Sequence, residues 1–490
     1  MTSSETGSPH RWWILLGVSL GVLMSTLDGS IVNIALRTLV RELNTSFAKV
    51  EWVVLSYLLV ITALILGVAR LGDMLGKKRI YIGGLALFTV GSLLCGIAPD
   101  VNWLIAFRAV QGLGAVMVTA LGAAIVTEAF PAAERGRAVG IIGSAISVGI
   151  ALGPSIGGIL LGSVGWRAIF LVNLPIGLVA IAIVAAFVPA SQPTQERQRF
   201  DYGGAFVLAV ALTCYALGMT LGQERGFGNP LIVGLLVAAV AGTALFLALE
   251  ARIAQPMLDL SIFRNRLFTM SLLIGVLVFV VLSSNALIMP FFLEQAQGYS
   301  VGQTGLMLAV VPVFIAVIAP ISGYLSDRFD ARVIGIAGLA LIAVGYFLGA
   351  TLTADVSILG YFLRVAPIGI GFGVFQSPNN SAVMGSVPRN RLGVASGLLA
   401  LSRSVGQSTG LPLMGAVFAS IVIAASGMQP DSAPPEAIVA GVRTSFVLAG
   451  GITLIALGVA VATLWLGRQA GAALPDLATP SADHAVIISD

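Results

Sequence analysis

The sequence predicts an all-α integral membrane protein with about fourteen membrane-spanning helices. Apolar residues make up 57% of the 490 positions and charged residues only 10%, whereas a soluble domain typically carries about 25% charged residues. Apolar runs of about twenty residues recur along the whole chain, and one helix needs about that length to cross a bilayer. The basic residues are scattered between these runs and form no single face, so nucleic-acid binding is not expected.

Each apolar run predicts one helix. Residues 1–11 are polar and lead directly into the first run, which is longer than the core of a signal peptide and is therefore interpreted as a retained helix. Cys95 and Cys214 both lie inside runs, so neither a disulfide framework nor a metal site is expected. The predicted spans are 12–36, 51–72, 80–98, 103–127, 137–161, 166–188, 202–222, 230–250, 268–293, 303–325, 333–352, 357–385, 393–424 and 441–467.

The distribution of Lys and Arg predicts the orientation of the chain. If the N-terminus is cytoplasmic, seventeen of the 26 basic residues fall in cytoplasmic loops or tails and six fall on the outer side. The remaining three, Arg108, Arg364 and Arg403, fall inside spans. Because cytoplasmic loops of membrane proteins carry an excess of Lys and Arg, this bias predicts that both termini are cytoplasmic.

The two halves of the chain repeat each other at an offset of 254 to 257 residues. The offset predicts an N-terminal six-helix bundle (1–188), two inserted helices with flanking cytoplasmic loops (189–267), a C-terminal six-helix bundle (268–467) and a disordered cytoplasmic tail (468–490). Two parallel six-helix halves are typical of transporters whose substrate site lies between the halves near the midplane. The matching pairs are Asp73 and Asp327, Arg108 and Arg364, Gly140 and Gly397, Gly149 and Gly406, and Gly153 and Gly410.

Four segments carry recognisable motifs. They are LDGSIVNIAL (27–36), ARLGDMLGKKR (69–79), RAVQGLG (108–114) and a glycine-proline series in the fifth predicted helix. Together they resemble motifs of the major facilitator superfamily, and within it the fourteen-span drug:proton antiporters of the EmrB/QacA-like subfamily. The resemblance covers nearly the whole chain and implies the major facilitator fold, with two six-helix bundles and two inserted helices.

The resemblance implies a conformational gate on the cytoplasmic side. In this family the loop acid, here Asp73, faces the N-terminus of the second half's fifth helix, which begins here near Gly393. A carboxylate is stabilised at a helix N-terminus by roughly 0.3–1 kcal/mol. The alternative is ordinary positive-inside charge beside a short turn. The expected gate residues are Gly72, Asp73, Gly76, Lys77, Arg79, Glu128, Asp327 and Arg328.

The glycine-proline series matches the motif that marks antiporters within the superfamily. Glycines at this spacing let helices approach closely, and a proline bends a helix at a fixed point. The alternative is an ordinary packing face of small residues. The motif residues are Gly140, Gly149, Gly153, Pro154, Gly157 and Gly158.

Elimination leaves one candidate group for proton coupling. His10 and His484 lie in the tails, and of the 22 acidic residues only Asp28 lies well inside a predicted span. A carboxylate at a helix centre costs about 2.5–3.5 kcal/mol on insertion scales, so its presence needs a reason. At 1.5 Å rise per residue, Arg108 can reach the layer of Asp28 if the first and fourth predicted helices face one cavity, as the resemblance implies. We therefore predict that Asp28 and Arg108 form the proton-coupling pair; a static ion pair is the alternative.

Polar residues inside the spans are candidate substrate contacts, although each could equally form helix–helix hydrogen bonds. Asn379, beside Asn380, is a further candidate. If Arg364 and Arg403 face the cavity, an anionic or zwitterionic substrate is expected; if they do not, a lipophilic cation is expected. The predicted substrate contacts are Asn33, Tyr57, Gln111, Asn285, Gln376, Asn380 and Arg403.

The resemblance implies a proton-coupled antiporter that exports amphipathic small molecules from a bacterial cell through the inner membrane, as in multidrug efflux and antibiotic resistance. Its expected partners are the lipid bilayer, the substrate and protons, with the proton gradient as energy source. We expect no enzyme activity, cofactor, metal or ATP site, and a periplasmic adaptor stays open. The alternatives are a transporter of one anionic or zwitterionic metabolite, an uptake symporter, and a non-transporting sensor with a transporter fold.

Overall fold

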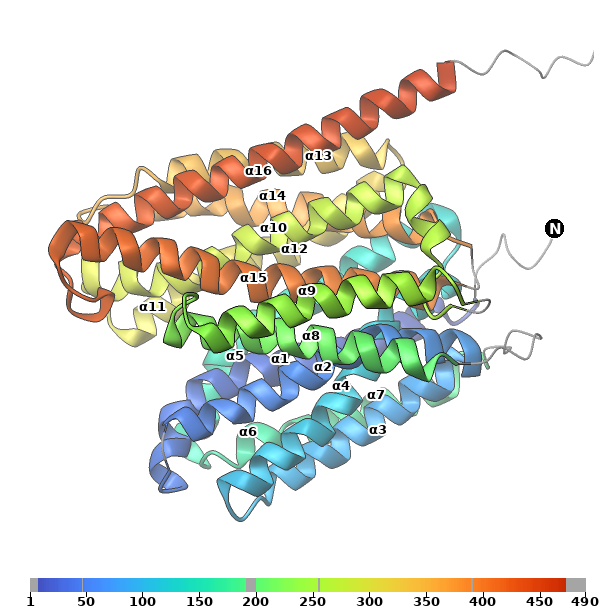
Figure 1. Cartoon of the computed structure of the whole chain (residues 1–490), viewed down its shortest axis with the longest axis horizontal. Helices are drawn as coiled ribbons and strands as arrows, with labels where there is room; N and C mark the ends of the chain where they lie inside the picture. The colour runs from blue at the N-terminus through green and yellow to red at the C-terminus, as the bar shows by residue number, and fades with distance from the viewer. Residues whose placement is uncertain (1–7, 46, 191–199, 254–255, 389–390, 473–490) are drawn as a thin grey trace, which may run out of the picture.

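The structure is a computed structural model, and it describes residues 8–45, 47–190, 200–253, 256–388 and 391–472 (Figure 1). Within these ranges, fourteen helices are long and apolar enough to cross a membrane. The predicted all-α class and the predicted number of spans are therefore confirmed. Residues 473–490, which make up most of the predicted disordered tail, lie outside the described residues.

Sixteen α-helices form these spans, because two spans each contain two helices. Ala168–Phe187 contains α6 and α7, and Gln303–Ser326 contains α12 and most of α11. The helices are α1 (Arg11–Glu42), α2 (Phe47–Leu75), α3 (Lys77–Gly96), α4 (Val101–Ala129), α5 (Arg135–Ser163), α6 (Ala168–Leu171), α7 (Asn173–Phe187), α8 (Tyr202–Arg225), α9 (Pro230–Glu250), α10 (Arg266–Phe291), α11 (Val301–Leu308), α12 (Val310–Ser326), α13 (Ala331–Gly349), α14 (Ile358–Gly385), α15 (Leu392–Ser426) and α16 (Pro435–Ala472).

Polar residues at the helix ends explain where several spans begin. Asp100 accepts hydrogen bonds from the backbone amides of Asn102 and Trp103 and thereby caps α4. Asn229 caps α9 in the same way and is followed by Pro230, which needs no amide partner in the first turn. These caps supply acceptors for amide groups that the helix itself leaves unbonded.

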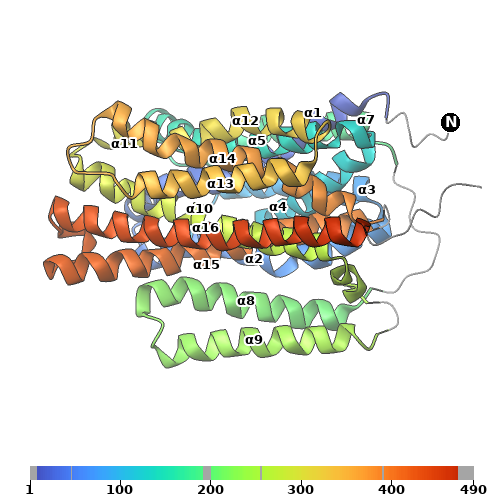
Figure 2. The same ribbon diagram turned by 90° about the horizontal axis from the view of Figure 1, so that it is seen from above.

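The helices form two bundles and a separate hairpin. Helices α1–α7 pack together, α10–α16 pack together, and the bundles meet where α5 contacts α12 and where α2 contacts α15. The hairpin of α8 and α9 lies to one side of both bundles (Figure 2). Helix α8 contacts both α2 and α15, and Tyr215 on α8 forms a hydrogen bond with Thr409 on α15.

One end of the helices holds the described N-terminus, the α2–α3 turn and the α12–α13 turn, and we name it the basic end (Figure 1). Gly76 in the first of these turns has φ +97°, a left-handed conformation that only glycine adopts without steric cost. At this end the two bundles are also joined by a side-chain hydrogen bond, in which the hydroxyl of Ser377 on α14 donates to the backbone carbonyl of Gly136 on α5 at 2.8 Å.

Candidate transport site and its gates

Asp28 lies in the middle of α1 at the centre of a hydrogen-bond network. One carboxylate oxygen pairs with Arg108 Nη1 at 2.5 Å, and the other accepts hydrogen bonds from Gln111 Nε2 and Asn173 Nδ2, each at 2.9 Å. These partners lie on α4 and α7. Sequence reasoning placed Arg108 at the depth of Asp28, and the structure brings the two side chains into direct contact.

The arginine of this pair is held from several sides. Arg108 Nε donates to the carbonyl of Val53 on α2 at 2.9 Å, and its guanidinium lies 4.1 Å from the ring centroid of Tyr57. Gln111 in turn accepts from Arg108 at 2.6 Å and donates to Ser92 on α3 at 2.7 Å. The network therefore ties α1, α2, α3, α4 and α7 together.

The network is enclosed within the N-terminal bundle. Asp28, Arg108, Gln111 and Asn173 are all 0% exposed. Two of the predicted substrate contacts, Tyr57 and Gln111, belong to this network, where they hold Asp28 and Arg108. In this conformation water does not reach the carboxylate, so a proton can reach Asp28 only after the surrounding helices move.

A separate cavity lies between the two bundles. Its walls come from α1, α4 and α5 of one bundle and from α10, α14 and α15 of the other. Three predicted substrate contacts, Gln376, Asn380 and Arg403, line this central cavity. Its volume is about 60 Å³, which suits water and is far below the size of a drug-binding pocket. The central cavity is therefore contracted in this conformation.

The two arginines of the C-terminal bundle have different surroundings. Arg364 donates to the hydroxyl of Thr351 at 2.9 Å and to the carbonyl of Gly360 at 3.0 Å, close to the start of its own helix α14. Arg403 lies further along α15 and contributes to the wall of the central cavity. Only one of the two conditions for an anionic substrate, that Arg403 faces the cavity, is therefore met.

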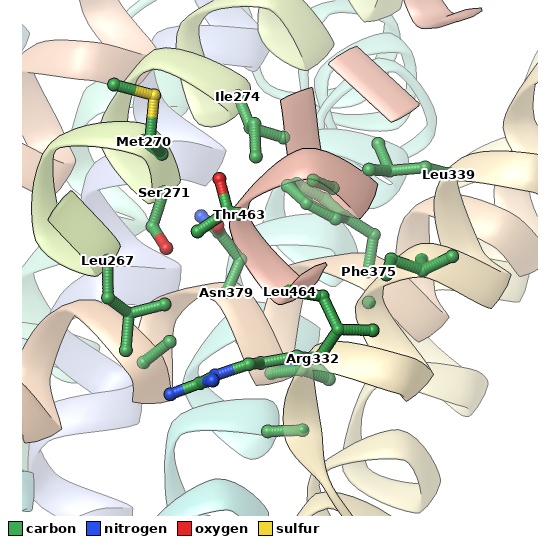
Figure 3. A pocket seen from close by; sticks show the side chains of 16 residues that line it. Leu267, Met270, Ser271, Ile274, Arg332, Leu339, Phe375, Asn379, Thr463 and Leu464 are labelled. Carbon is green, nitrogen blue, oxygen red and sulfur yellow. The ribbon is translucent and has the colours of Figure 1, made fainter. Parts of the chain in front are cut away.

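Asn379 lines a different hollow inside the C-terminal bundle, between α10, α13, α14 and α16. Figure 3 shows its polar side chain beside those of Ser271 and Thr463, with Arg332 nearby. This hollow measures about 50 Å³. Asn285 is buried in α10 with its amide oxygen unpartnered, and the side chain of Asn33 lies outside the described part of the chain.

Asp73 forms the first of two carboxylate contacts between the bundles at the basic end. Its two oxygens accept hydrogen bonds from the backbone amides of Gly393 and Val394, at 2.9 and 3.0 Å, where α15 begins. Lys77 lies 2.8 Å from Asp73 and 2.8 Å from Glu128, so it bridges two acids. We name Asp73, Lys77, Glu128, Gly393 and Val394 the α15 gate.

Asp327 forms the matching contact, in which an acid of the C-terminal bundle binds a helix of the N-terminal bundle. It accepts hydrogen bonds from the backbone amides of Gly136 and Arg137, at 2.7 and 3.0 Å, where α5 begins. We name Asp327, Gly136 and Arg137 the α5 gate. Burial, the largest influence, raises the pKa of Asp327 above its ordinary value, although the two backbone amides oppose the shift.

Two charged residues of the predicted gate, Arg328 and Arg79, take part in neither contact in the described structure. Arg328 stacks on Tyr324 of the neighbouring helix α12, with 4.4 Å between its guanidinium and the ring centroid. Arg79 is exposed on α3 and has no ion pair within the described ranges. Basic residues on a solvated turn need no fixed partner. Gly72 packs against Leu121 on α4.

The glycines of the fifth-helix motif form two contact surfaces. A Cβ atom on Gly140 would lie 2.5 Å from the carbonyl oxygen of Ala319, on α12 of the opposite bundle. Gly149, Gly153 and Gly157 instead face α1, where Cβ atoms would collide with Thr26, Ser30 and Ile31. Gly158 faces open space, and the surroundings of Pro154 lie outside the described part of the chain.

Two polar residues of the Asp28 network were not predicted from the sequence. Asn173 donates directly to the carboxylate, and Ser92 supports Gln111. Asn173 is the first residue of α7 and lies in an apolar stretch, two residues before Pro175. A polar amide in such a stretch could have indicated a buried hydrogen-bond partner. Ser92 gave no signal, because single serines are common in membrane helices.

A comparison with protein families matches this chain to the Major Facilitator Superfamily over residues 18–411 and 272–482. The riboflavin transporter RibZ of Clostridioides difficile is 36% identical over 411 residues, which cover 84% of this chain and 89% of that protein. The multidrug resistance protein Stp of Mycobacterium tuberculosis is 33% identical over 425 residues, which cover 86% of this chain and 79% of that protein.

A solved structure of the human organic anion transporter MFSD10 is similar to this chain, with a TM-score of 0.64. The match covers 92% of this chain and 100% of that one. Its sequence identity is 16%, so the likeness concerns the arrangement of helices.

Proposed function

Because the chain belongs to the major facilitator superfamily, we propose that it is a proton-coupled antiporter that exports amphipathic small molecules by alternating access. The observation that carries the proposal is Asp28. It is the carboxylate that lies in the middle of a described membrane helix, and it pairs with Arg108. A charged pair at this depth is costly and marks ion pathways and proton relays in membrane proteins.

Protonation of Asp28 would remove its charge and weaken its bonds to α4 and α7. Helix α1 packs closely against α5 through Gly149 and Gly153, and α5 begins at the α5 gate. A shift of α1 would therefore be transmitted along α5 to the basic end. In this scheme the proton acts on helix packing at a distance from the central cavity and does not compete with the substrate for one site.

The energy available per proton is sufficient to drive such a change. A proton that crosses the membrane contributes about 2.3 kcal/mol per 100 mV of membrane potential. A pH difference adds about 1.4 kcal/mol per unit. One proton could thus concentrate an uncharged substrate roughly tenfold for each 1.4 kcal/mol released.

Export is favoured over uptake by the resemblance of the fifth-helix motif to that of antiporters and by the similarity of this chain to Stp, a multidrug resistance protein. A second candidate function is transport of one metabolite, because the relative RibZ is a riboflavin transporter. We place the protein in a bacterial inner membrane, with the basic end and both termini in the cytoplasm and with lipid, substrate and protons as its partners.

The test is flux in proteoliposomes under an imposed pH gradient, with cationic, anionic and neutral amphiphiles. Asp28→Asn should abolish gradient-driven accumulation, while exchange of substrate between the two sides without a gradient continues. Asp100→Asn is the matched control, because Asp100 is also an acid in contact with helix α4 and asparagine caps a helix equally well. Full gradient-driven transport by Asp28→Asn would refute the coupling role.

A further inference from the structure

We propose that the transported molecules are amphiphilic anions and that Arg403 binds their anionic group in the central cavity. This inference rests on the proposed function, since it names the substrate class of the same cavity. It depends on three observations: the surroundings of Arg403, the polar atoms beside it, and the apolar remainder of the cavity wall.

The first observation is that Arg403 differs from the other two arginines of the spans. Arg108 is neutralised by Asp28, and Arg364 is bonded to Thr351 and Gly360. Within the described residues, Arg403 has no carboxylate, hydroxyl or carbonyl partner. It is nevertheless half-buried in the wall of a cavity at the interface between the bundles.

An unpaired cation in such a place is costly. Moving an ionised side chain away from water is unfavourable unless an opposite charge and hydrogen bonds compensate for the lost hydration. Asp28 cannot supply that charge, because its oxygens are fully engaged inside the N-terminal bundle. The central cavity therefore carries a net positive charge, which attracts anions and repels the lipophilic cations that the sequence left possible.

The second observation is a group of polar atoms that share the cavity with Arg403. Ser396 is 2% exposed and Gln376 is 6% exposed. Among the described residues, neither the hydroxyl of Ser396 nor the amide oxygen of Gln376 has a hydrogen-bond partner. The amide of Asn380 also lines this cavity. The hydroxyl of Ser396 and the amide nitrogens of Gln376 and Asn380 can donate hydrogen bonds to an anion that the guanidinium holds, whereas the amide oxygen of Gln376 can only accept.

The guanidinium is suited to a planar or tetrahedral oxyanion. Arginine presents donors in a fixed fork that matches two oxygens of a carboxylate, sulfonate or phosphate group, and such bonds are stronger than neutral ones. A lysine offers a single point charge at the same place. A site that uses the fork should therefore lose affinity even in the conservative exchange of arginine for lysine.

The third observation is that the rest of the wall is apolar and comes largely from the opposite bundle. Val22 on α1, with Ile142 and Ile146 on α5, faces the cavity from the N-terminal bundle, and Phe279 on α10 completes it. A molecule with its anionic group on Arg403 would place an apolar body against these side chains. It would thus touch both bundles, as a substrate that responds to their rocking must do.

Binding requires the cavity to widen beyond its present 60 Å³. The cavity should therefore be tested at equilibrium in detergent, where both conformations are accessible and no proton gradient is needed. The probes are 1-naphthalenesulfonate and trimethyl-(1-naphthyl)ammonium, which share one apolar body and differ in charge. Isothermal titration calorimetry gives Kd for the wild type and for Arg403→Gln and Arg403→Lys.

We expect the wild type to bind the sulfonate at least tenfold more tightly than the ammonium. Arg403→Gln should abolish this preference, and Arg403→Lys should retain only part of it. Arg364→Gln is the matched control, because it also removes an arginine from a C-terminal-bundle span but leaves the cavity wall intact. Thermal unfolding of each variant shows that a loss of binding does not result from a loss of fold.

The proposal is overturned if the ammonium binds as tightly as the sulfonate, if neither probe binds the wild type, or if Arg403→Gln leaves the sulfonate Kd unchanged. These results are separate from those for the transport function. A wild type that binds the sulfonate selectively but moves no probe under a pH gradient would support the site and contradict the antiporter. A wild type that exports the ammonium equally well would contradict the site alone.

Discussion

Asp73 and Asp327 make the same contact in opposite directions. Asp73 belongs to the N-terminal bundle and holds the first amides of α15, whereas Asp327 belongs to the C-terminal bundle and holds the first amides of α5. The donating amides of Gly393 and Gly136 are 257 residues apart, which is an offset found in the sequence repeat. The closed basic end is thus stabilised by two related carboxylate–helix contacts.

Asp73→Ala should open the basic end. The change leaves two backbone amides of α15 without an acceptor and removes a partner of Lys77. Loss of a buried hydrogen-bond partner costs about 1–3 kcal/mol, so the closed conformation should become roughly 5- to 150-fold less populated. The measurement is the distance distribution between spin labels at exposed positions 79 and 332. Asp355→Ala, at an exposed acid, should leave it unchanged. An unaltered distribution in Asp73→Ala would show that this carboxylate does not hold the gate.

The glycines of α5 should differ sharply in their tolerance of a methyl group. In Gly153→Ala the new Cβ would collide with Ser30 on α1, whereas in Gly158→Ala it would face open space. Overpacking of a tight contact typically costs 1–3 kcal/mol. We expect Gly153→Ala to lower the unfolding temperature and the transport rate, with Gly158→Ala close to wild type. Equal behaviour of the two variants would mean that the contact between α1 and α5 is not tight.

Asn173→Ala should destabilise the N-terminal bundle. It removes one donor to the buried carboxylate of Asp28, and hydrogen bonds to charged groups contribute about 1.5–3 kcal/mol. The readout is thermal unfolding in detergent. Asn102→Ala, at an exposed position near the start of α4, is the control and should unfold at the wild-type temperature. If both variants unfold together with the wild type, the amide of Asn173 adds nothing to the network.

The α5 gate should close more firmly as the pH falls. Burial raises the pKa of Asp327 in the closed gate, against the opposing amides of Gly136 and Arg137 and with a smaller contribution in the same direction from Glu134. In an open gate the hydrated carboxyl would return to its ordinary pKa. The closed state therefore binds the proton more tightly, and this part of its stability is lost as the pH rises through the raised pKa.

The same spin-label pair measured between about pH 4 and pH 7 tests this effect. The closed population should increase on acidification in the wild type. Asp327→Asn carries no titratable group at that position, so the part of the pH dependence that belongs to Asp327 should disappear. A variant that follows the wild-type curve would assign the effect to another group.

The sequence predicted the membrane helices and the main ion pair well, because these features depend on properties that the chain itself displays. Long apolar runs determine where spans lie. Asp28 stands out because a carboxylate is costly in such a run, and helical rise places Arg108 within reach of it where the implied family fold lets α1 and α4 face one cavity. The gate contact between Asp73 and Gly393 was implied by family resemblance, and the structure brings these residues together.

The sequence could not predict which way each polar side chain faces. Adjacent residues on a helix point about 100° apart, so Asn379 and Asn380 line different hollows although they are neighbours. Arg364 and Arg403 likewise differ, since Arg364 bonds to Thr351 and Gly360 whereas Arg403 lines the central cavity. Tyr57 and Gln111 were expected at the substrate and instead hold Arg108 and Asp28, because the network closes inside one bundle.

The hairpin of α8 and α9 spans the boundary between the bundles along α2 and α15, and the bond between Tyr215 and Thr409 fastens it there. Because the hairpin is attached to both bundles on this flank, like a strap, it restricts their separation there. When the bundles rock, α2 and α15 should behave as the hinge line, and the wider displacement should fall on the flank where α5 meets α12. Molecules dissolved in the lipid would then enter or leave the central cavity sideways through that second flank, and the strapped flank would remain sealed throughout the cycle.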